Sequence, residues 1–208
     1  MAKLYFYYSA MNAGKSTTLL QSSYNYCERG MDVLLFSPCI DTRLTKPYVH
    51  SRIGLKEEAV GFDDDLDFFT YVKEQEKKLT KLRCVLIDEA HFLKKEQVKQ
   101  LTQITTEIQI PVLCYGLRSD FKGEPFEGSK YLLIWAEELV EIKTICHCGR
   151  KATMNLRIDP AGNSVEEGSQ IQIGGNESYL STCMVHFRES NKKFSKGEIT
   201  QVYAELNQ

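Results

Sequence analysis

The segment SAMNAGKST, at residues 9–17, restricts the possible folds of this chain more than any other feature. It follows an apolar run from Leu4 to Tyr8 and precedes a segment, starting at Thr18, whose apolar spacing favours a helix. A strand, a loop of small residues and a helix in this order form a phosphate-binding loop, because backbone N–H groups and the positive end of the helix surround phosphate oxygens. The sequence therefore predicts a P-loop nucleotide site here.

The P-loop pattern predicts a role for individual residues of the loop. We expect Lys15 to reach the terminal phosphates and Ser16 to ligate Mg²⁺. Ser9 stands where the usual pattern GxxxxGK[ST] has glycine, and a serine can make the tight turn if its φ stays negative. The alternative is a glycine-containing helix start with no ligand. The predicted ATP-binding residues are Ser9, Ala10, Met11, Asn12, Ala13, Gly14, Lys15, Ser16, Thr17 and Asp88.

Short apolar runs alternate with longer segments of helical spacing through the first 144 residues, which is typical of a parallel sheet. The predicted strands are Leu4 to Tyr8, Val33 to Ser37, Cys84 to Ile87, Val112 to Tyr115 and Leu139 to Lys143. The predicted helices are Lys15 to Arg29, stopped by Gly30, then Leu66 to Leu82, Lys95 to Ile108 and Gly128 to Ala136. We therefore expect an α/β fold: a RecA-like P-loop sheet flanked by helices.

The pattern changes after Thr144 into short strand candidates, glycines and residues that ligate metals. We expect three parts: a nucleotide-binding α/β domain at residues 1–144, a zinc-binding subdomain with a lasso loop at 145–193, and a polar C-terminal tail at 194–208. At 208 residues the chain can bury one main core and an appendage, but hardly two nucleotide-binding lobes.

A second signal is the run from Cys84 to Ile87, which ends in Asp88 and Glu89. Ligands of open α/β folds bind at the carboxyl ends of the strands, so both carboxylates should lie beside the phosphate loop. We expect Asp88 to help hold Mg²⁺ and Glu89 to accept a proton from the group that attacks the γ-phosphorus. The alternative is a solvated acidic turn that caps the next helix.

Residues 88–91 spell DEAH, a motif also found in helicases. Such helicases close ATP between two lobes and need a basic channel, whereas this chain has room for one lobe and a net charge of −2. The same charge argues against a nucleic-acid partner. No apolar span long enough for a membrane helix occurs, and MAKLYFYY lacks a leader layout, so we expect a cytoplasmic protein with no membrane partner.

The third constellation is a set of metal-ligating side chains in two clusters, CHC and CMVH. Their thiolates and imidazole match in number a tetrahedral structural Zn²⁺ site made of Cys146, Cys148, Cys183 and His186. CxC is tighter than the usual CxxC, so His147 could compete as a ligand, and free thiols are the alternative. Zinc would pin both ends of the glycine-rich loop between the clusters. Disulfides are not expected among the seven cysteines.

Five segments together resemble bacterial type II thymidine kinases, the family related to the human cytosolic enzyme. They are SAMNAGKST, CIDTR at 39–43, LIDEAHF at 86–92, YGLRSDFKGEPF at 115–126, and IGGNESY at 173–179 between the zinc clusters. The resemblance runs in one collinear order from about Lys3 to His186, which makes it more specific than any single motif. The chain departs from the animal enzymes in its CxC and histidine zinc set, and Ser9 replaces the leading glycine.

The resemblance implies particular site residues. Glu89 would be the general base that deprotonates the 5′-hydroxyl of thymidine, and Arg43, with Asp41 beside it, would offset charge at the transferring phosphoryl group. The implied catalytic set is Glu89, Lys15 and Arg43, with Mg²⁺ held by Ser16 and Asp88. Phe121 would stack on thymine and Tyr179 would belong to the lasso. The implied substrate-binding residues are Met11, Leu117, Phe121, Gln170, Ile171, Gln172, Ile173, Gly174 and Tyr179.

Simpler roles stay open for three of these residues. Phe121 could be an ordinary loop aromatic, Tyr179 could pack under the metal, and Arg43 could serve a surface ion pair. The resemblance also implies ATP as co-substrate, a homotetramer and feedback inhibition by dTTP. Two functional hypotheses follow: a thymidine kinase, or a P-loop ATPase or helicase-like factor whose zinc module binds a macromolecular partner. A preference for deoxyuridine or another pyrimidine would only change the base pocket.

Overall fold

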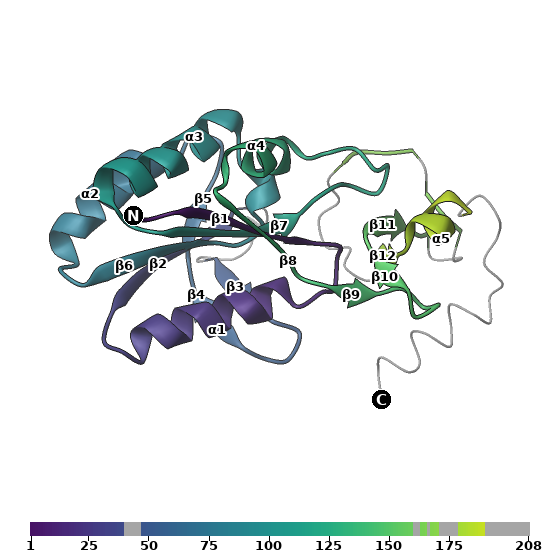
Figure 1. The fold of residues 1–208 in the computed structure, drawn as a ribbon, viewed down its shortest axis with the longest axis horizontal. Helices are drawn as coiled ribbons and strands as arrows, with labels where there is room; N and C mark the ends of the chain where they lie inside the picture. The colour runs from purple at the N-terminus through teal and green to yellow at the C-terminus, as the bar shows by residue number, and fades with distance from the viewer. Residues whose placement is uncertain (40–46, 160–162, 166, 171–178, 190–208) are drawn as a thin grey trace. The chain divides into compact units, whose positions relative to one another are not determined.

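The computed structural model describes residues 1–39, 47–159, 163–165, 167–170 and 179–189 (Figure 1). They divide into two structural units. The first unit comprises Met1–Tyr8, Gly14–Arg118 and Pro125–Ile142, and the second comprises Ser9–Ala13, Ser119–Glu124 and the described residues from Lys143 onward.

A six-stranded sheet forms the centre of the first unit, with strand order β5-β2-β6-β7-β1-β8. Its members are β1 (Leu4–Ser9), β2 (Asp32–Pro38), β5 (Val60–Phe62), β6 (Leu82–Ile87), β7 (Val112–Leu117) and β8 (Glu138–Glu141). The pairs of β2 with β5 and β6, of β6 with β7 and of β1 with β8 are all parallel. The predicted parallel α/β sheet is therefore confirmed.

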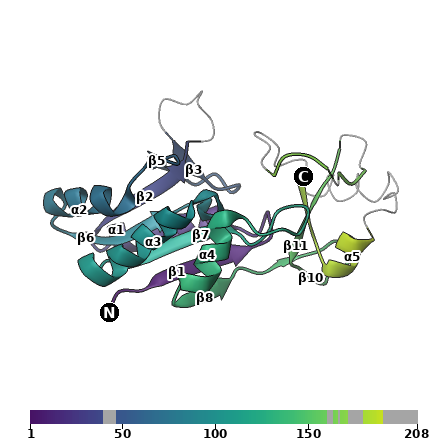
Figure 2. The same ribbon diagram turned by 90° about the horizontal axis from the view of Figure 1, so that it is seen from above.

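Helices cover both faces of this sheet, as the two views in Figures 1 and 2 show. Helices α2 (Phe68–Lys78), α3 (Lys95–Gln103) and α4 (Glu127–Trp135) lie on one face. Helix α1 (Lys15–Cys27) lies on the other, next to the hairpin formed by β3 (Tyr48–His50) and β4 (Lys56–Glu58).

Alternation along the strands divides the core of this unit into two layers. Successive side chains of a strand point to opposite faces of its sheet. Along β6, Val85 and Ile87 belong to one buried hydrophobic cluster, whereas Cys84 and Leu86 belong to the other. A strand buried on both faces reads as a continuous apolar run, which explains why the central strands were recognisable in the sequence.

Several boundaries differ from the predictions. The predicted helix from Leu66 to Leu82 is wrong at its C-terminal end, because α2 stops at Lys78 and the buried Leu82 opens β6. Helix α1 ends two residues before Arg29, and Gly30, at φ +70°, donates its N–H to Cys27 O. The strands β3, β4 and β5 were not predicted, since each has only three residues.

The segment predicted to complete the third helix has a different geometry. Residues Ile104–Ile108 form a π-helical turn after α3. The hydroxyls of Thr105 and Thr106 both donate to Thr102 O, at 2.8 and 2.9 Å. Side-chain hydroxyls that bond to helix carbonyls compete with the regular backbone ladder, which accounts for the wider turn.

The second unit contains two short antiparallel ribbons and a short helix. Strand β9 (Thr144–Ile145) pairs with β10 (Lys151–Ala152), and β11 (Met154–Arg157) pairs with β12 (Tyr179–Thr182). Helix α5 (Met184–Arg188) follows directly. The expected tail at 194–208 lies outside the described residues.

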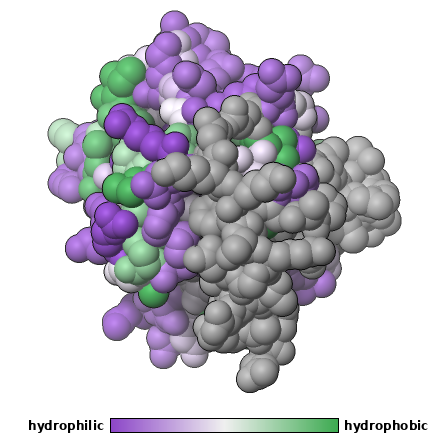
Figure 3. Space-filling view, turned by 90° about the vertical axis from the view of Figure 1, so that its right-hand side faces the viewer, coloured by the Kyte–Doolittle hydropathy of each residue, from purple (hydrophilic) through white to green (hydrophobic). Residues whose placement is uncertain are grey.

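The large exposed hydrophobic side chains of the described residues are spread over several elements, such as Tyr24 in α1, Ile134 in α4 and Ile145 in β9. On the face drawn in Figure 3, hydrophobic residues form small groups among hydrophilic ones. No helix in the described part of the chain combines the length and the apolar character needed to cross a membrane.

Candidate functional site

The start of α1 has the local geometry expected of a phosphate-binding loop. Gly14, the N-cap residue, has φ +84°, a left-handed conformation that glycine adopts at little cost. Asn12 also has a positive φ of 60°, whereas Ser9 does not, as the predicted tight turn with serine requires. Gly14 supplies no side-chain cap hydrogen bond, and backbone N–H groups at a helix N-terminus suit an anion.

Lys15 is the first residue of α1, and only 9% of it is exposed. Burial lowers the pKa of its ammonium group, while the nearby carboxylates of Glu89 and Asp88 act in the opposite direction. A buried ammonium group is costly unless it meets negative charge. Lys15 is therefore placed in the first unit with two acidic residues from the end of β6.

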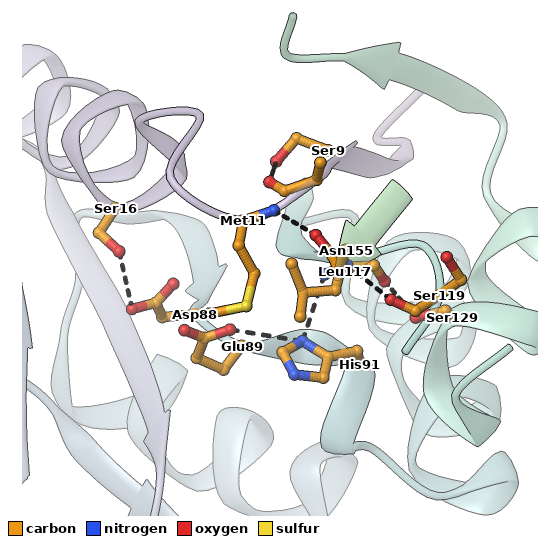
Figure 4. Close-up of polar contacts among 11 residues, drawn as sticks. Ser9, Met11, Ser16, Asp88, Glu89, His91, Leu117, Ser119, Ser129 and Asn155 are labelled. Carbon is orange, nitrogen blue, oxygen red and sulfur yellow. Dashed lines mark hydrogen bonds and ion pairs between the residues drawn. The ribbon is translucent and has the colours of Figure 1, made fainter. Parts of the chain in front are cut away.

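Asp88 follows β6 and is 5% exposed. Ser16 Oγ donates a hydrogen bond to its Oδ2 at 3.4 Å, whereas its buried Oδ1 accepts no hydrogen bond from the residues that the structure describes (Figure 4). Burial, and next the charge of Glu89, raise the pKa of Asp88 to about 7. An unsatisfied carboxylate oxygen beside a hydroxyl offers the oxygen ligands that Mg²⁺ prefers, so these residues fit that ion.

Glu89 has a backbone conformation that is unusual for a residue with a side chain, φ 47° and ψ 40°. Such left-handed residues carry strain and cluster at functional sites. Its side chain is 40% exposed; burial raises the pKa of its carboxyl group, and the charge of Lys15 opposes this. Glu89 is the N-cap of the next helical turn but makes no side-chain cap hydrogen bond, so the alternative role of a helix cap is wrong for this residue.

His91 is a site residue that the sequence analysis did not single out. It is 3% exposed, and its Nδ1 accepts a hydrogen bond from the backbone N–H of Leu117 at 3.2 Å. The same nitrogen lies 3.4 Å from Glu89 Oε2 (Figure 4). His91 belongs to both the DEAH and the LIDEAHF segments, neither of which by itself gives the histidine a role.

Two groups of predicted residues cannot be placed. Arg43, with Asp41, and the lasso residues Ile171, Gln172, Ile173 and Gly174 lie outside the described residues. Within the first unit the structure brings together Lys15, Ser16, Asp88 and Glu89, and His91 connects the last of these to Leu117.

The second unit gathers several of the predicted substrate-binding residues. Phe121 is buried, and the guanidinium of Arg157 lies over its ring, 5.2 Å from the centroid. Gln170 donates its side-chain N–H to Asp120 at 3.0 Å. Tyr179, in β12, is the register partner of Arg157 in β11, and burial raises the pKa of its hydroxyl group.

Met11 is tied to the same unit through a buried asparagine. The Met11 N–H donates to Asn155 Oδ1 at 2.7 Å, and the Asn155 side-chain N–H donates to Ser119 O at 2.8 Å (Figure 4). Ser181 Oγ donates to Met11 O. Asn155 is the other residue that the sequence did not reveal, because an isolated asparagine in a short strand has no recognisable pattern.

The four predicted zinc ligands lie together in the second unit. One ligand atom from each of Cys146, Cys148, Cys183 and His186 falls within 4.8 Å of the others. Cys148 Sγ and Cys183 Sγ are 3.9 Å apart, and His186 Nδ1 lies 3.2 Å from Cys146 Sγ. Tetrahedral Zn²⁺ with bonds of about 2.3 Å would hold its sulfur ligands about 3.8 Å apart, so the set fits zinc.

Two neighbours modify this cluster. Arg150 Nε donates to Cys148 Sγ at 3.3 Å, and this hydrogen bond is the main reason that the pKa of Cys148 falls to about 6. A lowered thiol pKa favours the thiolate that binds metal. The ring of His147 stacks on that of His186, with centroids 4.1 Å apart, while its Nδ1 is 3.6 Å from Cys146 Sγ.

The sequence is similar to those of known proteins over most of its length. A family model described as "Thymidine kinase" matches residues 2–187. A thymidine kinase of Legionella pneumophila (strain Lens) is 61% identical over 196 residues, covering 93% of this chain and 94% of the relative. One from Coxiella burnetii is 59% identical over 188 residues, covering 90% and 96%, and one from Shewanella oneidensis is 61% identical over 191 residues, covering 91% and 98%. This chain therefore belongs to the thymidine kinase family.

Proposed function

We propose that this protein transfers the γ-phosphoryl group of ATP to the 5′-hydroxyl of thymidine and so forms thymidine monophosphate. Membership of the thymidine kinase family supports the reaction, and the observation that carries it is the group of Lys15, Ser16, Asp88 and Glu89 around the start of α1. Phosphoryl transfer needs little more from a protein than a phosphate cradle, a cation, a metal site and a placed carboxylate.

Each residue of this group has a part in the proposed mechanism. The N–H groups at the start of α1 and the ammonium of Lys15 bind the phosphates and offset the charge that moves to the leaving oxygen. Glu89 accepts the proton of the 5′-hydroxyl as that oxygen attacks the γ-phosphorus. When bound to Ser16 and Asp88, Mg²⁺ supplies further neutralisation of the phosphate charge. Arg43 is proposed to act on the same phosphoryl group.

Burial and the charge of Lys15 act in opposite directions on the pKa of Glu89. A carboxylate accepts a proton more readily when its pKa is raised, and burial raises the pKa of Glu89. The positive charge of Lys15 opposes that rise and favours the charged form of the carboxylate. The pair therefore keeps a usable base in a site that is partly protected from water.

Base recognition is proposed for residues of several segments. Phe121 would stack on thymine, Met11 and Leu117 would line the pocket of its methyl group, and Tyr179 would bind its edge. The backbone of residues 170–174 would complete recognition. Discrimination between thymidine and deoxyuridine rests on one methyl group, which is worth about 1–3 kcal/mol.

Further parts of the proposal depend on the family resemblance. We propose a structural Zn²⁺ at the Cys146 cluster, feedback inhibition by dTTP, a homotetramer and a cytoplasmic location. We also propose that residues 1–144 form the nucleotide-binding domain and 145–193 the zinc-binding subdomain. The distances among the Cys and His ligand atoms support the zinc assignment. A site closed by four protein ligands stabilises loops rather than performing chemistry, so the role proposed for this zinc is structural.

The second hypothesis, a P-loop ATPase or helicase-like factor, is not favoured. Relatives that match nearly the whole chain are named thymidine kinases, and the chain is slightly acidic. The two functions differ in what stimulates ATP consumption. Thymidine should stimulate it strongly in a thymidine kinase, whereas DNA or RNA should stimulate it in the alternative.

A nucleoside panel tests the proposed function. Thymidine, deoxyuridine, deoxycytidine and purine deoxynucleosides are incubated with Mg-ATP, and monophosphate products are quantified by chromatography, with the zinc content measured on the same sample. We expect thymidine to be phosphorylated fastest. An equally low rate with every nucleoside would remove the assignment.

A further inference from the structure

The turn that carries Glu89 is held by a buried histidine. His91 belongs to the 3-10 turn η1 (Ala90–Phe92), which directly follows Glu89. Its ring packs against Phe92 and Phe126, with ring centroids 4.1 and 4.5 Å away. An imidazole enclosed by two aromatic rings has little rotamer freedom, so its nitrogens have fixed positions.

One nitrogen of His91 faces two groups of the site. Its Nδ1 accepts the N–H of Leu117, at the end of β7, and lies 3.4 Å from Glu89 Oε2. Because Nδ1 accepts, it carries no proton, and the imidazole is neutral with its hydrogen on Nε2. Burial, together with the charge of Lys15, lowers the pKa of His91 well below its ordinary value, in agreement with a neutral ring.

Two glycines allow other elements to approach this turn. A Cβ on Gly116 would lie 3.0 Å from the backbone N of His91 and 3.4 Å from its Nδ1. A Cβ on Gly128, in α4, would lie 2.5 Å from Ala90 O and 2.9 Å from His91 O. A side chain at either position would collide with the turn. β7 and α4 can therefore pack closely against the turn only because both residues are glycine.

The backbone conformation of Glu89 depends on the elements that surround its turn. Its left-handed backbone is strained, and its side chain makes no cap hydrogen bond to the turn. A strained conformation persists only when neighbouring structure enforces it. Glu89 Oε2 lies 3.4 Å from His91 Nδ1, which has no hydrogen to donate, so His91 acts on Glu89 through the turn that it fixes to Leu117.

We propose that His91 is a positioning residue for phosphoryl transfer: by joining the Leu117 backbone to the turn after β6, it fixes where the Glu89 carboxylate stands. This inference rests on the proposed function and adds a residue to its machinery. His91 does not exchange protons with substrate in this role. A carboxylate displaced by about 1 Å loses the alignment that transfer requires, which costs up to about 100-fold in rate.

Steady-state kinetics of substituted proteins test the proposal. In His91→Leu the Leu117 N–H loses its acceptor, and we expect kcat to fall 10- to 100-fold while KM for ATP stays within about twofold. In His91→Asn the amide oxygen takes the place of Nδ1 and can accept from the Leu117 N–H, so kcat should recover to within about threefold of wild type. Glutamine carries its amide to the place of Nε2 and leaves the Leu117 N–H without an acceptor, so His91→Gln should resemble His91→Leu.

Gln97→Leu is the matched control, because Gln97 is equally buried in the same unit and donates to the backbone oxygens of Asp63 and Leu66. It should lower the thermal midpoint of unfolding without lowering kcat. If His91→Leu does not fold, the comparison of His91→Gln with His91→Asn gives the same test.

Each remaining outcome counts against a specific claim. A wild-type protein that forms no thymidine monophosphate would overturn the proposed function and this inference with it. An active wild type, with kcat of His91→Leu or His91→Gln within twofold of it, would overturn the positioning role alone. So would a loss of kcat in Gln97→Leu as large as that in His91→Leu, since general destabilisation would then explain both.

Discussion

The side-chain amide of Asn155 joins Met11 to Ser119, two backbone segments of the second unit that are more than 100 residues apart in sequence. Its oxygen accepts from the Met11 N–H and its nitrogen donates to the Ser119 carbonyl, while the residue is 2% exposed. Both polar atoms are therefore satisfied in a buried place, which is where a lost partner is most costly.

Asn155→Leu should destabilise the protein by about 1–3 kcal/mol, because it leaves a half-buried N–H of Met11 and a buried carbonyl of Ser119 without partners. It should also raise KM for thymidine, since Met11 is proposed to line the methyl pocket. Urea unfolding and initial-rate kinetics measure the two effects. Asn163→Ala, at an exposed asparagine of the same unit, is the control and should stay within about 0.5 kcal/mol of wild type. Equal behaviour of the two variants would contradict the bridging role.

Asp88 gives the protein a specific dependence of stability on pH. Its pKa rises from 3.8 to about 7 on folding, so folding takes up a proton between these pH values. The penalty for burying its charge therefore grows from about pH 4 to about pH 7 and then stays constant. Below pH 4, where the carboxyl is protonated in both states, there is no such penalty.

Asp88→Asn remains neutral at every pH, so without Mg²⁺ and nucleotide it should be more stable than wild type at pH 8, by up to about 4 kcal/mol. The advantage should be less than half as large at pH 5. Urea unfolding of both proteins from pH 5 to pH 8 gives the comparison. A stability difference that does not change with pH would contradict the burial of a charged Asp88.

The parts of the fold that could be predicted are those with local causes. Apolar strands buried on two faces, the small residues before Lys15 and the acidic pair after β6 all leave direct traces in the sequence. The positions of Asn155 and His91 could not be predicted, because each matters through a partner distant in sequence: Met11 for the first and Leu117 for the second. Such contacts depend on tertiary packing, which has no short-range signature.

The predicted ends of some helices and strands were wrong for a similar reason. The helical spacing of apolar residues continues past Lys78, where α2 ends. In the structure, however, Leu82 is the first residue of β6, where it is buried and pairs with Asp32 of β2. The three-residue strands β3 and β5 form because neighbouring elements supply their partners, not because of a preference in so few residues.

Metal removal should expose the role of the cysteine and histidine cluster. We expect one Zn²⁺ per chain and a lower thermal midpoint after treatment with a chelator, reversed by added zinc, because four ligands close the ends of a long loop. His186→Ala should lose zinc. His147→Ala is the matched control, since its ring stacks on His186 but lies outside the set of four, and it should keep zinc. Loss of zinc from His147→Ala with retention by His186→Ala would reverse the assignment.

Gly128→Ala should disturb the packing of α4 against the turn that follows Glu89. Its new methyl group would approach three carbonyl oxygens, those of Ala90, His91 and Leu93, at 2.5–2.9 Å. We expect a loss of about 1–3 kcal/mol or more, together with reduced kcat. Gly30→Ala serves as the control: nothing lies within 4 Å of its added Cβ, and its φ of +70° costs about 1 kcal/mol. A smaller loss in stability for Gly128→Ala than for Gly30→Ala would contradict the close packing.

The central claim is that Glu89 accepts the proton of the thymidine 5′-hydroxyl. Glu89→Gln keeps the size of the side chain and one acceptor oxygen but cannot take up that proton. We expect formation of thymidine monophosphate to fall by about 10²- to 10⁴-fold in single-turnover assays, while the dissociation constant for ATP changes by less than about threefold. A Glu89→Gln protein that phosphorylates thymidine at a rate near that of wild type would contradict the account.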